Sequence, residues 1–63
     1  MVIIKSGIMY YRNIYDLISR EGIEVEAGSL WKFYPKDNEM ILVDEDQMAT
    51  TPMVKSKFKK AGF

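Results

Sequence analysis

"LWKFYPKDNEMILV", residues 30–43, decides the fold of this chain, because it places two apolar runs on either side of a polar corner. Short aromatic and aliphatic runs joined by a loop with Pro, Asp and Asn are typical of a β-hairpin. The sequence therefore predicts strands over residues 30–34 and 40–43, with residues 35–38 as the turn. Both strands carry apolar residues on both sides, so this hairpin has more apolar surface than one face of a sheet needs.

The chain before the hairpin also favours β-structure. In "IEVE", residues 23–26, apolar residues alternate with glutamates, which is typical of a strand with one dry and one wet face. The segment "VIIKSGIMYY", residues 2–11, is rich in β-branched and aromatic residues on either side of Ser6-Gly7. It predicts either one strand with a bulge or a hairpin, and the sequence leaves both forms open.

Two short helices are expected to flank these strands. "NIYDLISREG", residues 13–22, has apolar residues at helical spacing, with Asn13 as the N-cap and Gly22 as the left-handed residue at the end. After a short strand over residues 47–50, Thr51-Pro52 is a good start for a terminal helix. Lysines crowd the end of that helix, where they favour the negative end of its dipole.

These elements predict a small α+β domain that occupies all of residues 1–63. Its centre would be a small antiparallel sheet or a partly open SH3-like barrel, since curling leaves fewer exposed strand edges. One short helix lies in the N-terminal half and one at the C-terminus. A chain of this length is sufficient for one domain only.

Residues 26–63 carry a resemblance to a known group of proteins. Gly28-Ser29-Leu30-Trp31 precedes an apolar strand, an acidic "VDEDQ" turn follows, and the chain closes with "KFKKAGF". This arrangement resembles small uncharacterised proteins of Gram-positive prophages and mobile elements, which are regarded as compact SH3-like barrels. The resemblance implies an accessory binding protein, and it implies no functional residue.

Composition excludes several classes of function. Nine basic and nine acidic residues give zero net charge, and the chain has no histidine and no cysteine. A protein without these residues lacks the usual neutral-pH acid or base, thiol nucleophile and thiolate metal ligands. The four glycines are too far apart to form a phosphate-binding loop. We therefore expect no enzyme activity, no cofactor and no small-molecule substrate.

The acidic run and the absence of cysteine carry two further expectations. The carboxylates of residues 44–46 could ligate a divalent cation, but they lack the spaced positions of a calcium loop, so we interpret them as a solvated turn. A chain without disulfides or an apolar run of about 18 residues is expected in the cytoplasm and not in a membrane.

The surplus of apolar residues predicts a surface for a protein partner or for self-association. The aromatic and methionine side chains that could form this surface are Tyr10, Tyr11, Trp31, Phe33, Tyr34 and Met40. Trp31 could instead belong to the core, and the sequence leaves this open. The predicted function is a non-enzymatic protein-interaction module, such as an accessory or inhibitor protein of a phage or mobile element.

A small nucleic-acid-binding protein is the alternative function. Four lysines surround an aromatic residue near the end of the chain and could contact phosphates while Phe58 stacks on a base: Lys55, Lys57, Lys59 and Lys60. The zero net charge weakens this alternative, because it gives no general attraction to a polyanion.

Overall fold

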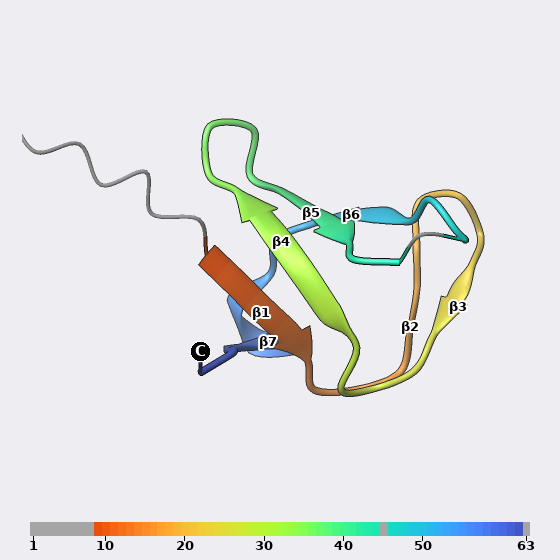
Figure 1. Ribbon diagram of the computed structural model, residues 1–63, viewed down its shortest axis with the longest axis horizontal. Coiled ribbons are helices and arrows are strands. Elements are labelled where there is room, and N and C mark those ends of the chain that lie inside the picture. Colours follow the sequence, from red (N-terminus) through yellow and green to blue (C-terminus); the bar gives the residue numbers. More distant parts are fainter. Residues whose placement is uncertain (1–8, 45, 63) are drawn as a thin grey trace, which may run out of the picture.

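The computed structural model describes residues 9–44 and 46–62 and folds them into two antiparallel sheets (Figure 1). The strands in chain order are β1 (Met9–Asn13), β2 (Leu17–Ile18), β3 (Glu24–Val25), β4 (Leu30–Tyr34), β5 (Glu39–Leu42), β6 (Thr50–Pro52) and β7 (Phe58–Lys60). A single 3-10 turn, η1 (Lys55–Lys57), precedes β7. The larger sheet has the spatial order β6-β5-β4-β1-β7, and the smaller sheet pairs β2 with β3.

The predicted hairpin is confirmed as the β4–β5 pair, in which Phe33 lies opposite Met40. Its turn closes through a hydrogen bond from the Asp37 N–H to the Tyr34 carbonyl (3.1 Å). Asn38 adopts a left-handed backbone conformation (φ 53°). Asparagine tolerates this region better than most residues, so the polar corner has the residues that its geometry requires.

β1 lies between β4 and β7 in the larger sheet and so brings the two ends of the described chain together. It pairs with β4 through Met9 opposite Phe33, and with β7 through Asn13 opposite Phe58. The predicted strand or hairpin over residues 2–11 is therefore a strand from Met9 onward. The alternative turn at Ser6-Gly7 lies outside the described residues.

The helix predicted over residues 13–22 is wrong. This segment contains β2 and the turn that leads to β3, and Gly22 (φ 86°) serves that turn instead of a helix end. Leu17 packs against the core, whereas Ile14 and Ile18 are 41% and 70% exposed, so the three do not share a buried face. A helix of two turns is marginal in isolation. Pairing of β2 with β3 supplies the segment's hydrogen bonds instead.

The predicted terminal helix is also wrong, as is the α+β class. Thr51-Pro52 belongs to β6, and only η1 is helical before Phe58 begins β7. Phe58 is 5% exposed and packs edge-on against Trp31 (5.7 Å between ring centroids), which favours a strand beside β1 over a helix. The strand expected over residues 47–50 begins only at Thr50. The described residues contain no α-helix, and the fold is nearly all β.

The core lies between one face of the large sheet and an arm formed by residues 14–28. Figure 1 shows this arm leaving the sheet after β1, carrying β2 and β3, and returning at β4. The buried apolar residues are Val25, Trp31, Met40, Ala49 and Phe58. We call the sheet face that carries Trp31 and Met40 the inner face, and the opposite side the outer face. Val25 from the arm packs on the inner face.

Polar contacts fasten the arm to the edge of β6. The Arg20 N–H donates to the Thr50 carbonyl (2.8 Å), and the Thr50 N–H and hydroxyl donate to the Glu21 carboxylate (2.8 and 2.6 Å). These bonds lower the pKa of Glu21 to about 2, because they favour its ionised form. Arg20 also forms an ion pair with Glu39, and this hydrogen bond raises the pKa of Arg20. The backbone N–H and carbonyl of Thr50, on the edge strand β6, are therefore already hydrogen-bonded to the arm.

Candidate protein-binding groove

A buried asparagine holds together the segments that form the candidate site. Asn13 is 1% exposed, and its Nδ2 donates to the carbonyls of Tyr15 and Glu26 (2.9 Å each). Its Oδ1 accepts hydrogen bonds from the Ser29 N–H and the Trp31 indole N–H (3.0 Å each). The amide thus connects the end of β1, the returning arm and the start of β4. The sequence suggested only a helix cap at Asn13, and no local pattern indicated this role.

The returning arm makes a tight turn before β4. Gly28 has φ 88°, and its N–H donates to the Asn13 carbonyl (2.7 Å). The Ser29 hydroxyl donates to the Glu26 carbonyl (2.7 Å), and Arg12 Nη1 donates to the Gly28 carbonyl (2.7 Å). Because a left-handed conformation is costly for residues with a side chain, glycine suits this position. The turn at Gly28, which forms one wall of the candidate site, is therefore hydrogen-bonded to Asn13 and Arg12 of β1.

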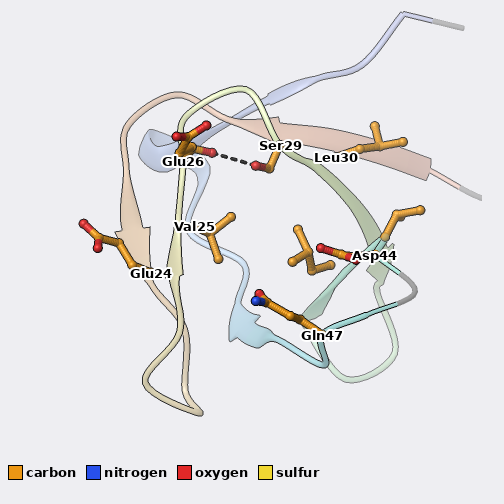
Figure 2. A pocket seen from close by; sticks show the side chains of 9 residues that line it. Glu24, Val25, Glu26, Ser29, Leu30, Asp44 and Gln47 are labelled. Carbon is orange, nitrogen blue, oxygen red and sulfur yellow. Dashed lines mark hydrogen bonds between the residues drawn. The ribbon is translucent and has the colours of Figure 1, made fainter.

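A groove of about 310 Å³ lies between the returning arm and the loop that joins β5 to β6. Figure 2 shows Val25, Asp44 and Gln47 pointing into this space, while the Glu24 side chain points away from it. We call it the acidic groove. It is lined by Glu24, Val25, Glu26, Ser29, Leu30, Leu42, Val43, Asp44 and Gln47.

A second hollow of about 400 Å³ adjoins the acidic groove across the β5–β6 loop. Its lining residues are Ile41, Leu42, Asp44, Asp46, Gln47 and Met48. The Asp46 N–H donates to Asp44 Oδ1 (2.8 Å), so these two lining residues are hydrogen-bonded to each other. Four carboxylates and several apolar side chains line the hollows, and none of the described residues that line them is basic. The surface therefore combines apolar side chains with negative charge.

The residues predicted to bind a protein separate into two groups. Trp31 and Met40 are 0% exposed, so they belong to the core and cannot form a surface. Tyr11 and Phe33 are half-buried, pack against that core and contact each other edge-on (5.6 Å between ring centroids). Of the predicted set, only Tyr10 and Tyr34 lie on the outer face.

The lysines predicted to bind nucleic acid are all exposed. Lys55 and Lys57 belong to η1, whereas Lys59 and Lys60 belong to β7 and point to opposite sides of that strand. Phe58, expected to stack on a base, is buried against the core. The structure therefore does not gather these four lysines around an accessible ring.

Comparison with protein-family models, with curated proteins and with solved structures finds no match for this chain. In the part of the chain that the structure describes, no cluster of three or more carboxylates is arranged to hold a metal ion. Among the same residues there is no helix with the length and apolar character that spanning a bilayer requires. The chemistry of the surface is thus the only guide to its function.

Proposed function

We propose that this chain is a non-enzymatic protein-interaction module that binds a basic segment of a partner protein in the acidic groove. One observation carries the proposal: the groove and the adjoining hollow bring apolar side chains together with carboxylates, and neither has a basic lining residue among those described. Lysine and arginine match this pattern, because their aliphatic stems pack on apolar surface while their charged heads reach carboxylates.

The walls of the groove support binding because they are held in place before a partner arrives. The Asn13 side chain fixes the arm wall at Glu26 and Ser29, and the β4–β5 pairing fixes the opposite wall near Leu42. A site that is already ordered loses less conformational entropy on binding than a flexible one. The open shape of the groove suits an extended segment with one apolar and one or two basic residues.

The same charges give the proposed interaction a kinetic signature. Carboxylates on one side of the molecule attract a cationic partner over a distance, and this attraction is screened by salt. Association should therefore slow as ionic strength rises, while dissociation changes less. The resemblance of residues 26–63 to prophage proteins supports an accessory or inhibitor role, with self-association through the same groove as a variant of this proposal.

The test is a fluorescence-anisotropy titration with a labelled peptide of alternating lysine and leucine. Glu26→Gln and Asp44→Asn should each weaken binding by roughly two- to five-fold, as expected for the loss of one exposed ion pair. Asn keeps the oxygen that accepts the Asp46 N–H, so the loop should remain intact. Asp37→Asn, in the β4–β5 turn outside the groove, is the charge-matched control. Equal weakening by all three variants would show general attraction and would refute the groove as the site.

A further inference from the structure

The outer face of the sheet has a different chemistry from the acidic groove. In the strand register, Tyr10 on β1 lies opposite Lys32 on β4. Arg12 lies opposite Leu30 on β4 and opposite Lys59 on β7. Residues two apart on one strand share a face, so these side chains occupy the same side of the sheet. Three cations from three neighbouring strands therefore surround a tyrosine.

Two contacts fix how these cations are presented. Arg12 Nη1 donates to the Gly28 carbonyl (2.7 Å), which holds the guanidinium at the turn before β4. A guanidinium has five N–H donors, so this bond leaves others for a ligand. Lys32 Nζ lies 5.3 Å from the centre of the Tyr34 ring. A charged group and an aromatic ring therefore lie side by side on β4.

None of the described residues on this part of the outer face carries a negative charge. The described outer-face residues of β1, β4 and β7 are Tyr10, Arg12, Leu30, Lys32, Tyr34 and Lys59, and none is a carboxylate. Glu39 lies opposite Tyr34 on β5, but it is paired with Arg20. Tyr34 and Lys59 are exposed, whereas Tyr10, Arg12, Leu30 and Lys32 are half-buried.

We propose that the outer face of β1, β4 and β7 binds single-stranded nucleic acid. Arg12, Lys32 and Lys59 contact successive phosphates, and bases pack against Tyr10 and Tyr34. Charge complementarity favours a polyanion, and rings beside cations favour one that carries bases over an acidic protein. Leu30 on this face also lines the acidic groove, but none of the groove's carboxylates belongs to the face. Of the four lysines that the sequence suggested, it uses only Lys59.

The test is binding of a fluorescein-labelled oligothymidine of about a dozen nucleotides, measured by anisotropy over a salt series. Three phosphate contacts predict a log–log salt slope of about −2, because each contact to a single strand contributes about −0.7. Replacing Lys32 and Lys59 together by Gln should reduce the slope to about −0.7. At 0.1 M salt, this variant should bind about 25-fold more weakly, or about five-fold for each contact.

The matched control is Lys55→Gln combined with Lys57→Gln, which removes the same charge from η1. It should leave both affinity and slope unchanged. Tyr34→Leu should weaken binding without changing the slope, because it removes stacking and no phosphate contact. Thermal unfolding checks that each variant is folded, as expected for side chains that are exposed or half-buried.

Three results would overturn the proposal. One is no binding of the oligothymidine even at low salt. Another is an equal loss of affinity in the η1 control, which would indicate attraction to charge anywhere on the protein. The last is equally tight binding of an abasic oligonucleotide or a polyglutamate peptide, which would make the outer face a site for any polyanion or for an acidic protein.

Discussion

Replacing Asn13 by Ala should remove most of the stability of this protein. The substitution leaves the buried Trp31 indole N–H and the part-buried Ser29 N–H without their acceptor. It also removes the donor to the carbonyls of Tyr15 and Glu26. An unsatisfied buried group costs about 1–3 kcal/mol, and the part-buried groups cost less, so we expect a loss of about 3–5 kcal/mol in total. A chain of this size has a stability of about 3–9 kcal/mol.

The assay is urea unfolding followed by the fluorescence of Trp31, the only tryptophan in the chain. The Asn13→Ala variant should show a much lower urea midpoint at an unchanged slope, or be largely unfolded without urea. Ser19→Ala is the control. Ser19 is 5% exposed, but its Oγ accepts only from N–H groups of its own turn, at Glu21 and Ile23, so we expect a loss of about 1 kcal/mol.

A second substitution at the same position separates the acceptor role of Asn13 from its donor role. Asn13→Asp keeps an oxygen for Trp31 and Ser29 but places a carboxylate against the carbonyls of Tyr15 and Glu26. Burial and these carbonyls should raise the pKa of the new carboxyl in the folded state. Its stability should then increase as pH falls through that raised pKa. A loss below 1 kcal/mol for Asn13→Ala would refute this account of the amide. So would a stability of Asn13→Asp that does not rise, relative to the unsubstituted protein, as pH falls.

Three further predictions concern the arm and the core. Hydrogen bonds from Thr50 lower the pKa of Glu21 from 4.5 to about 2, so the thermal midpoint should fall as pH drops from 4.5 toward 2, and Glu21→Gln should flatten this dependence. Gly28→Ala should cost about 1–2 kcal/mol in urea unfolding from left-handed strain alone, since an added Cβ meets no atom within 4 Å. Met40→Ala should cost about 2–5 kcal/mol and lower the thermal midpoint, because this side chain is 0% exposed and its loss leaves a cavity; a near-neutral result would contradict its place in the core.

The parts of the fold that the sequence predicted correctly are those indicated by patterns among residues that are adjacent in the chain. The β4–β5 hairpin follows from two apolar runs around a corner in which Asn38 can adopt a left-handed conformation. The strand around Val25 follows from alternation, and Val25 is indeed buried between exposed glutamates. Both patterns depend only on neighbouring residues, and for this reason the elements that they predict are present in the folded chain.

The missed elements depend on partners that are far away in the sequence. A helix pattern over residues 13–22 was overridden because Asn13 bonds to Glu26, Ser29 and Trp31, none of which is a local neighbour. Phe58 forms a strand because β1, from the other end of the chain, offers it a pairing edge. Tertiary contacts of this kind override weak helix propensity in short segments.

The acidic groove could not be predicted for the same reason. Its two walls, around Glu26 and around Asp44, meet only because β4 and β5 pair and the arm folds back onto the inner face. In the sequence, Glu26 belonged to an alternating strand and Asp44 to a charged turn. Neither pattern alone indicates a shared surface.

The most direct test of the central claim is an NMR titration of the isotope-labelled protein with the lysine–leucine peptide. Binding in the acidic groove predicts amide shift changes concentrated in residues 24–30 and 42–47. The amides of η1 and of β7 should stay unperturbed. Shift changes confined to η1 and β7, or none at millimolar peptide, would contradict the proposal that the groove binds a basic protein segment.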